Sequence, residues 1–448
     1  MCVCVCVCAK EEEEEEEEGD YCKDIKENKT KESSFEQGEN VRGDTRMWLG
    51  NGFARRLRRV GDRSKRRFLS TSLYSWGTGT EGQLGLYFVP GGKGTSFTVP
   101  TPQIVSGLNG KNVSQISCGN NHSAVVSSDG SVYTWGKNDY GQLGLGENSD
   151  PMVITPERVK GLEGVKIKSV KCGFYHTAAL SEDGEVFTWG WGGNWMQGAG
   201  ALGHGDKNTH HEPHIVEALL DDGLVIDEIE CGKAHTVART DNGELWTWGK
   251  GEYGRLGNGG SADQLLPEPV ELLMDVGTCT QVACGSSFTL ALMDDGSVYS
   301  WGRNEQGQLG IGGSMSMDHY AMEDYPVQIE GDLEGKVVTS VAAGFVQALA
   351  STEDNELFQW GMGQWLAPRI VLFEDGPQAI VDASCGDRFN VVVTESGDTY
   401  TWAKGYFQKG VLGHEDQKTQ RFPAKVGGLD SNAIGVSCGQ KHTIALVE

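Results

Sequence analysis

The sequence predicts an all-β protein, a seven-bladed β-propeller that is closed by pairing of its N- and C-terminal strands in one blade. Three observations predict this fold: a recurring tryptophan, a Cys-Gly pair between successive tryptophans, and two chain ends that each lack the part of a repeat that the other carries. The tryptophans are 42 to 59 residues apart, at Trp76, Trp135, Trp189, Trp248, Trp301, Trp360 and Trp402. Such a period is typical of a repeat architecture.

The clearest repeat spans residues 170–205. A strand-like run ends at Cys172, and Asp183-Gly184 then separates two alternating runs, of which the second ends at Trp189. Asp-Gly between alternating runs predicts a tight hairpin, because a type I′ turn needs a positive φ at both central residues. The runs are short and rich in β-branched and aromatic residues, without helical periodicity. Each repeat is therefore expected to be a small antiparallel sheet, and radial stacking of such sheets gives a propeller.

The two ends of the repeat region complement each other. Residues 73–76 open it with a tryptophan strand that has no Cys-Gly strand before it, and residues 438–448 close it with a Cys-Gly strand that has no tryptophan strand after it. Joined in one blade, they complete seven blades and a closed ring. Closure removes open sheet edges, which would otherwise template aggregation.

The cysteines and histidines of the repeats are expected to be structural. Six cysteines share one slot, one per repeat, at Cys118, Cys172, Cys231, Cys284, Cys385 and Cys438, with Ala343 in the remaining slot. Symmetry separates them and Cys-x-x-Cys spacing is absent, so neither a metal site nor a disulfide framework is expected, and reduced thiols fit an intracellular compartment. The histidines four residues later are His122, His176, His235 and His442. Repetition at one position, with Phe or Gln in the other blades, indicates a scaffold hydrogen bond rather than catalysis.

The loop after each tryptophan varies between repeats. Its commonest form is Gly-Gln-Leu-Gly, as at residues 141–144 and 307–310. The Trp360 repeat lacks this motif, and Ala403 follows Trp402 where Gly is usual. We expect that side of the ring to be irregular, and irregular blades are candidates for partner docking.

In their order along each repeat, Cys-Gly-x-x-His-Thr, Asp-Gly, Val-Tyr-Thr-Trp-Gly and Gly-Gln-Leu-Gly resemble the regulator-of-chromosome-condensation family of seven-bladed propellers, over about residues 72 to 448. The resemblance implies the fold. It leaves the function open, because the family includes exchange factors, photoreceptors and scaffolds. The Gly-Trp-Arg-His-Thr turns of the photoreceptor branch are absent here, which argues against light sensing.

Candidate partner-binding residues lie in two kinds of loop, because a rigid ring presents its specificity on loops. The turns between Gly and His contribute Phe174, Tyr175, Lys233, Phe345, Asp387 and Arg388. In the family, exchange factors use such turns to release nucleotide from a small GTPase; here Asp387 is the one acid among them. The Gly-rich loop after Trp189 contributes Trp191, Trp195 and Met196, which either pack against the neighbouring blade or form a binding hot spot.

No catalytic, metal or cofactor site is expected. The sequence has no phosphate loop, nucleophile elbow or His-Glu-x-x-His motif. A histidine group in the loop after Trp189 has two interpretations, a zinc site or solvated loop side chains, and comprises His204, His210, His211 and His214. It lacks a recognised ligand framework, so the second interpretation is favoured.

The N-terminal part divides at Met47. Residues 1–46 hold alternating Cys and Val and then eight consecutive glutamates, and we expect a disordered low-complexity arm, with a translated simple repeat favoured over a metal-binding or acidic interaction tail. Residues 47–71 are Arg-rich, nearly free of acids and end in hydroxyl residues, which is typical of a mitochondrial transit peptide. The alternative is a basic linker that binds nucleic acid or a nuclear import receptor.

Charge favours protein partners. Residues 1–46 carry −8 and residues 47–70 carry +7, which leaves −24 of the total −25 for the ring. An acidic ring does not favour DNA, and no apolar run is long enough to span a membrane. We expect a non-enzymatic interaction scaffold, in the mitochondrial matrix if translation starts at Met47 and otherwise nuclear or cytoplasmic.

The resemblance implies roles in RNA maturation, ribosome assembly or GTPase-linked fusion, with mitochondrial RNA-processing or ribosome-assembly factors or a small GTPase as partners. The alternative function is a guanine-nucleotide exchange factor. A third hypothesis is chromatin binding through the basic tail between Arg55 and Arg67.

Overall fold

The computed structural model describes residues 71–87, 97–194, 196, 198–312, 321–404, 410–416, 418 and 420–448. The chain divides into two units, Met1–Arg66 and Arg67–Glu448, and all described residues belong to the second. The predicted acidic arm, nearly all of the predicted transit peptide and Trp195 lie outside the described residues.

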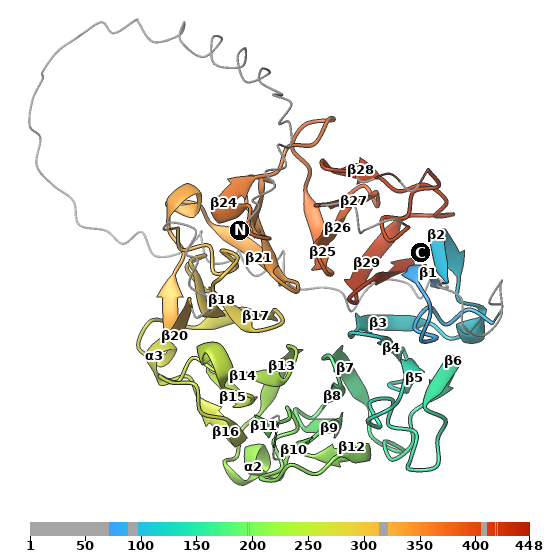
Figure 1. The fold of residues 1–448 in the computed structure, drawn as a ribbon, viewed down its shortest axis with the longest axis vertical. Coiled ribbons are helices and arrows are strands. Elements are labelled where there is room, and N and C mark those ends of the chain that lie inside the picture. The colour runs from blue at the N-terminus through green and yellow to red at the C-terminus, as the bar shows by residue number, and fades with distance from the viewer. Residues whose placement is uncertain are drawn as a thin grey trace, which may run out of the picture. The chain divides into compact units, whose positions relative to one another are not determined.

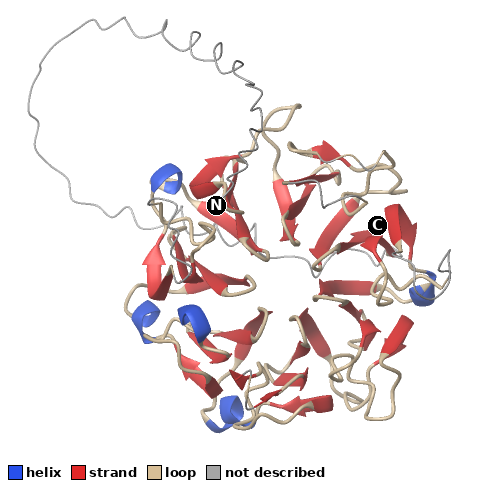
Figure 2. Cartoon of the chain, viewed as in Figure 1, coloured by secondary structure: helices blue, strands red, loops and turns tan. Residues whose placement is uncertain are grey.

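The described residues form a ring of seven four-stranded antiparallel sheets, the blades (Figure 1). Strands dominate the ring, with a few short helical turns (Figure 2). Blade 1 combines β1 (Ser72–Thr78), β2 (Thr98–Ile104), β29 (Ala433–Cys438) and β30 (His442–Val447). Blade 2 holds β3 (Val113–Cys118), β4 (His122–Ser127), β5 (Val132–Lys137) and β6 (Met152–Arg158). Blade 3 holds β7 (Ile167–Cys172), β8 (His176–Ser181), β9 (Val186–Gly190) and β12 (His210–Ile215).

The remaining blades continue in chain order. Blade 4 holds β13 (Ile226–Cys231), β14 (His235–Thr240), β15 (Leu245–Gly249) and β16 (Gln264–Pro269). Blade 5 holds β17 (Cys279–Cys284), β18 (Phe288–Met293), β19 (Val298–Arg303) and β20 (Met322–Gln328). Blade 6 holds β21 (Val338–Ala343), β22 (Gln347–Thr352), β23 (Leu357–Gly361) and β24 (Trp365–Ile370). Blade 7 holds β25 (Ile380–Cys385), β26 (Phe389–Thr394), β27 (Thr399–Ala403) and β28 (Ala424–Lys425).

Smaller elements decorate the connections. A two-stranded hairpin of β10 (Gly193–Asn194) and β11 (Gly198–Ala199) projects from the loop after β9. The helical turns are η2 (Ser106–Leu108), α2 (Glu217–Asp221), η3 (Glu252–Gly254), α3 (Glu271–Met274) and η4 (Gly331–Leu333). Each is too short to give a helical periodicity, which is why the sequence did not predict them.

Closure of the ring is confirmed. β1 pairs antiparallel with β30, with Leu73 opposite Leu446 and Trp76 opposite Thr443. Blade 1 therefore takes strands from both ends of the repeat region, as the two incomplete terminal repeats predicted.

The repeat tryptophans join each blade to the one before it. All seven are buried, and the Trp189 indole N–H donates to the Gln142 carbonyl at 3.0 Å. The equivalent bond to a backbone carbonyl in the preceding blade's loop is made by five more of them: Trp76, Trp135, Trp248, Trp301 and Trp360. A Cβ on Gly144 would lie 2.8 Å from the Trp189 indole nitrogen, and the φ there is +68°. Both the backbone conformation and the close approach of the indole therefore require glycine at this position.

The structural interpretation of the histidines is confirmed. The ring of His122 lies 3.0 Å from the Thr177 hydroxyl of the next blade, and His176, His235 and His442 make the equivalent contact. Burial lowers the pKa of His176 to about 3, so the imidazole is neutral. The seven described cysteines are all free, and burial raises the pKa of the Cys172 thiol to about 12.

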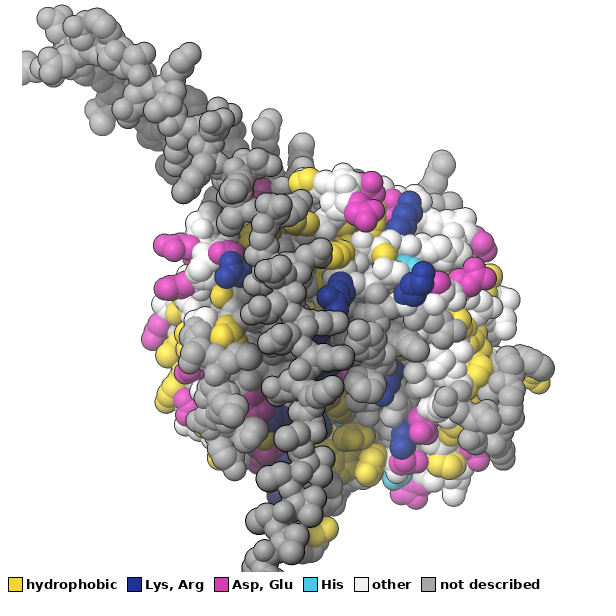
Figure 3. Space-filling model, turned by 45° about the horizontal axis from the view of Figure 1, so that its top comes forward, with side chains coloured by type: hydrophobic (Ala, Val, Ile, Leu, Met, Phe, Trp, Pro, Cys, Tyr) yellow, Lys and Arg dark blue, Asp and Glu magenta, His cyan; other side chains and the backbone are white. Residues whose placement is uncertain are grey.

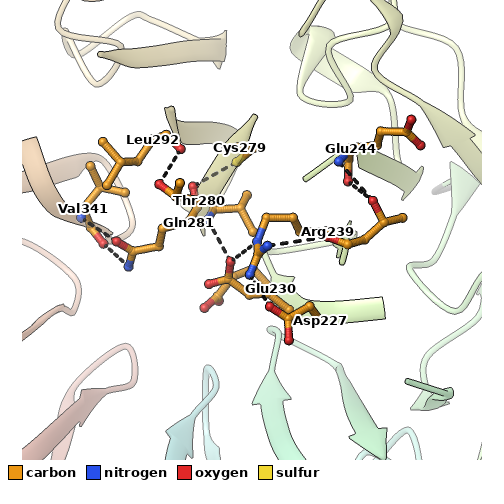
Figure 4. A network of polar contacts seen from close by, with 12 residues as sticks. Asp227, Glu230, Arg239, Glu244, Cys279, Thr280, Gln281, Leu292 and Val341 are labelled. Carbon is orange, nitrogen blue, oxygen red and sulfur yellow. Dashed lines mark hydrogen bonds and ion pairs between the residues drawn. The ribbon is translucent and has the colours of Figure 1, made fainter. Parts of the chain in front are cut away.

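Polar side chains on the inner strands link blades around the axis (Figure 4). The Gln281 side chain exchanges two 3.0 Å hydrogen bonds with the backbone of Val341 in the next blade. Arg239 pairs with Asp227 at 2.8 Å and with Glu228 at 3.0 Å. The Arg239 ion pairs lie within blade 4, and the Glu228 carboxylate also accepts the Val282 N–H of blade 5 at 3.3 Å. These contacts belong to the framework, because they satisfy backbone or charged groups that the ring buries.

Candidate docking surface on the loop face

The strand registers place the first turn of every blade and its third loop on one side of the ring. In blade 4, His235 at the start of β14 lies opposite Gly249 at the end of β15. The turn between β13 and β14 and the loop between β15 and β16 therefore emerge together, and the other blades repeat this arrangement. We call this side the loop face. It carries all of the described candidate partner-binding residues.

Phe174 and Phe345 meet across the ring. Their ring centroids are 5.7 Å apart, although they come from the first turns of blades 3 and 6. These blades are not neighbours in the ring, so the contact spans its axis. Both side chains are half-buried. The pair places an apolar surface at the centre of the loop face.

A line of aromatic rings extends from this centre to the rim. Tyr175 contacts Phe174 at 6.2 Å, Trp191 at 6.2 Å and Tyr140 at 5.4 Å between ring centroids. Tyr140, from blade 2, also contacts Trp191 at 6.5 Å. We call Tyr140, Trp191, Tyr175, Phe174 and Phe345 the aromatic strip. Its edge-to-face contacts fix the rings in place, and all five remain partly accessible.

Met196 lies in the hairpin of β10 and β11, in the same loop as Trp191. Its side chain is 72% exposed. The Asp263 carboxylate of blade 4 holds the hairpin, because it accepts the Ala199 N–H at 2.7 Å and the Gly251 N–H at 3.0 Å. Trp191 therefore packs against a neighbouring blade through its contact with Tyr140, whereas Met196 is presented to solvent.

Positive charge borders the strip. Lys233 lies with its ammonium 5.9 Å from the centre of the Phe174 ring. Three more cations lie nearby in blades 4 and 5: Lys250 follows β15, Arg255 follows η3 and Arg303 ends β19. We call Lys233, Lys250, Arg255 and Arg303 the basic cluster. Acidic side chains, by contrast, are spread around the visible rim of the ring (Figure 3).

Asp387 and Arg388 lie at the first turn of blade 7. The Asp387 N–H donates to the Gln440 carbonyl at 3.0 Å, and the carboxylate lies 4.0 Å from the Arg388 guanidinium. Burial raises the pKa of Asp387, while Arg388 and Lys441 oppose the rise. Phe345 is close by, since its N–H donates to the Gly386 carbonyl at 3.2 Å. The turn thus shares the loop face with the strip.

Comparison with known proteins decides the family. The regulator of chromosome condensation (RCC1) repeat matches residues 72–126, 129–180, 183–239, 242–292, 295–345 and 396–446. The chain belongs to the RCC1 repeat family. The matched segments leave out residues 346–395, which contain the Trp360 repeat whose loop departs from the motif.

Several RCC1 relatives match most of this chain. The RCC1 domain-containing protein RUG3, mitochondrial, of Arabidopsis thaliana is 31% identical and covers 85% of this chain and 89% of its own length. The ultraviolet-B receptor UVR8 of the same plant is 38% identical over 65% of this chain. The E3 ubiquitin-protein ligase HERC2 of Homo sapiens is 35% identical over 84% of it. The chain spans 61% of the length of UVR8 and 8% of HERC2.

Two solved structures share the fold of this chain. Human WBSCR16 aligns with a TM-score of 0.71 and 22% identity, over 85% of this chain and 99% of its own. Prp20p from Saccharomyces cerevisiae aligns with a TM-score of 0.73 and 21% identity, over 85% of this chain and 92% of its own.

The RCC1 ring also brings the loop histidines together. The ring centroids of His204, His210 and His214 are 4.2 to 6.1 Å apart, and His204 lies 2.9 Å from the Thr188 hydroxyl. Burial lowers the pKa of His204 to about 4. These rings pack on one another, so the expectation of separately solvated side chains was wrong for His204. Within the described ranges, no group of three potential ligands is placed to hold a metal ion.

Two features of the docking surface were not predicted from the sequence: Tyr140, and the basic cluster apart from Lys233. The available signal was Gly-Arg-Leu-Gly at residues 254–257, where other RCC1 repeats of this chain have Gly-Gln-Leu-Gly. Tyr140 gave no comparable signal, because its contacts depend on the packing of blade 2 against blade 3. None of the described helices is long and apolar enough to cross a membrane.

Proposed function

We propose that this protein is a non-enzymatic scaffold that binds partner proteins through the loop face. The aromatic strip is the observation that carries the proposal. Five partly exposed aromatic rings form a preorganised apolar surface on a rigid ring, since four of their five contacts are edge to face and three of the five join different blades. Rigid aromatic side chains dominate protein–protein binding energy because they bury much area and lose little conformational entropy.

We place the protein in mitochondria, in the matrix. The support is the Arg-rich segment 47–71 and the similarity to RUG3, a protein named as mitochondrial. The partners would then be mitochondrial RNA-processing or ribosome-assembly proteins. We propose that residues 47–71 are the transit peptide and that residues 72–448 are the working domain.

Proximity labelling with the full chain tests this proposal. The double variant Tyr175→Ala/Trp191→Ala should keep its location but lose most labelled neighbours, since it removes the middle of the aromatic strip. Phe422→Ala is the matched control, because Phe422 is 72% exposed but is not part of the strip. An unchanged set of neighbours in the double variant, or a wild-type protein that labels only cytosolic or nuclear proteins, would contradict the proposal.

A guanine-nucleotide exchange factor is the second candidate. Asp387 favours it, because this acid lies on the loop face next to Phe345, where a GTPase would meet the first turns of the blades. Nucleotide release from a panel of mitochondrial GTPases is the test. Acceleration by the full chain that is abolished in Asp387→Asn would favour exchange; no acceleration across the panel would favour the scaffold.

A further inference from the structure

Arg255 occupies a position that other blades fill with glutamine. In blades 1, 2 and 5 the corresponding residues are Gln83, Gln142 and Gln308, which are 1 to 2% exposed. Each glutamine side-chain oxygen accepts the backbone N–H two residues earlier, at 2.9 Å. A guanidinium has donors only and cannot make this bond. The arginine is therefore not needed to build the loop.

The position is an unfavourable one for a charge. Arg255 is 2% exposed, and burial lowers its pKa to about 10. Its Nε donates to the Glu252 carbonyl at 2.7 Å, but the Glu252 carboxylate is half-exposed and 3.4 Å from the guanidinium. A buried charge with such a weak partner destabilises the fold. The presence of Arg255 is therefore better explained by a role other than stability.

Three further cations are fixed around the same place by backbone hydrogen bonds. The Lys250 N–H donates to the Ala234 carbonyl at 2.8 Å, which anchors it at the first turn of blade 4. The N–H groups of Lys233 and Arg303 donate to the Ser286 and Ser287 carbonyls at 3.2 and 2.9 Å, at the first turn of blade 5. Burial lowers the pKa of Lys233, and the charges of the other three residues lower it further.

Tyr253 completes the wall of the basic cluster. The guanidinium carbons of Arg303 and Arg255 lie 4.5 and 5.7 Å from the centre of its ring. Its backbone has a φ of +65°, which is strained for a tyrosine. Strain of this kind persists where the surrounding structure enforces it, often at ligand sites.

The nearby acids do not neutralise the basic cluster. Glu252 pairs with Lys250 at 2.9 Å, and Glu305 pairs with Arg303. The Asp263 carboxylate instead holds two backbone N–H groups. Four cations therefore face three carboxylates, of which Glu252 and Glu305 are paired with members of the basic cluster, in a ring that carries −24 as a whole.

We propose that the basic cluster is an anion-binding site that receives carboxylates from an acidic segment of a partner protein. This proposal rests on the protein-binding function proposed above, and assigns the chemistry of the bound segment. Aromatic or aliphatic side chains of the same segment cover the adjoining aromatic strip, which Lys233 links to the basic cluster. A long polyanion such as RNA is disfavoured. Its phosphates more than about one Debye length, roughly 8 Å, from the basic cluster are screened from the cluster and lie instead next to the acidic side chains of the ring.

Peptide binding to the full chain, measured by fluorescence anisotropy, tests the site. The probe is a short fluorescein-labelled peptide of alternating Asp and Trp, and the matched peptide has Asn for Asp. The acidic peptide should bind more tightly, and Arg255→Gln should weaken its binding at least about tenfold, since the buried charge of Arg255 attracts the bound carboxylates in a medium of low effective dielectric constant. Arg255→Gln introduces the residue that three other blades carry there, so the loop should fold; Arg303→Gln is the second variant.

Lys137→Gln is the control. Lys137 follows the Trp-Gly of blade 2 as Lys250 and Arg303 follow theirs, and it pairs with the acid two residues later, Asp139, at 3.0 Å as they do with theirs, but its loop has Gln142 in place of a buried arginine. This variant should bind the acidic peptide as the wild type does. The proposal is overturned if the Asn peptide binds equally, if neither Arg255→Gln nor Arg303→Gln weakens binding, or if single-stranded oligouridine binds more tightly than the acidic peptide.

The two proposals fail separately. If Tyr175→Ala/Trp191→Ala loses its labelled neighbours while Arg255→Gln and Arg303→Gln keep them, the loop face binds proteins but the anion site is wrong. If all of these variants keep the wild-type neighbours, the protein-binding function of the loop face is wrong as well.

Discussion

The loops at residues 141–144 and 254–257 have the same backbone and different contents. In both, the glycines have a φ of about +70°, and the second residue's carbonyl accepts the indole N–H of the next blade's tryptophan at 3.0 Å. The side chain at that second residue differs: Gln142 completes the loop with a hydrogen bond, whereas Arg255 is a buried cation among other cations. The comparison distinguishes a backbone framework that the blades share from one side-chain position that the framework does not fix and that can therefore serve binding.

The largest effect should come from breaking the framework in both loops. Gly144→Ala and Gly257→Ala would each bring a Cβ within 2.6 to 2.8 Å of an indole nitrogen, at a positive φ. We expect each to lower the free energy of unfolding by about 3 kcal/mol in denaturant titrations. The control is Gly164→Ala, which also has a positive φ but meets nothing within 4 Å, and should cost about 1 kcal/mol. Unequal costs at residues 144 and 257 would show that the two loops do not share one framework.

Acid should weaken the framework at its histidines. The folded-state pKa of His176 is about 3, below its unfolded value of 6.5, so only the unfolded chain gains a proton as the pH falls below 6.5. This histidine's contribution is complete above about pH 6.5 and declines below it, by about 1–2 kcal/mol at pH 5. His176→Gln, the residue that blade 6 has at 347, should therefore show a smaller loss of stability between pH 7 and pH 5. An equal loss would mean that His176 is not a framework residue of this kind.

Blade 6 sharpens the comparison, because there the framework itself has changed. The Trp402 indole N–H donates at 2.9 Å to the side-chain oxygen of Gln359 rather than to a loop carbonyl. Gln359→Ala should leave this buried N–H without its acceptor and cost about 1–2 kcal/mol. Gln378→Ala, whose side chain bonds a nearby turn carbonyl in the connection to blade 7, should change stability by less than about 0.5 kcal/mol. Equal effects would contradict a substitute bond at Gln359.

Much of the framework could be predicted from the sequence, because its signals repeat. The tryptophan spacing, the two incomplete ends and the histidine slot each recur, and closure of blade 1 is confirmed by the pairing of Leu73 with Leu446. The departure at Trp360 was also visible, and the bond from Trp402 to Gln359 is its structural consequence.

The docking surface was only partly predictable. Phe174 and Phe345 were candidates, but their contact depends on the diameter of the ring, which brings blades 3 and 6 together at the axis. Arg255 differs from its equivalents by one residue, and a single substitution in a repeat gives no indication that three other cations surround it. Sequence periodicity predicts the features that the blades share, whereas the proposed binding residues are those at which the blades differ.

Arg255→Gln, with thermal unfolding and acidic-peptide binding measured on the same protein, tests the separation of framework and binding most directly. If Arg255 serves binding at a cost to the fold, the variant should be as stable as the wild type or more stable by about 1 kcal/mol, and should bind the peptide at least about tenfold more weakly. A variant that unfolds more readily yet binds the peptide as well as the wild type would contradict the account, because Arg255 would then be a structural residue.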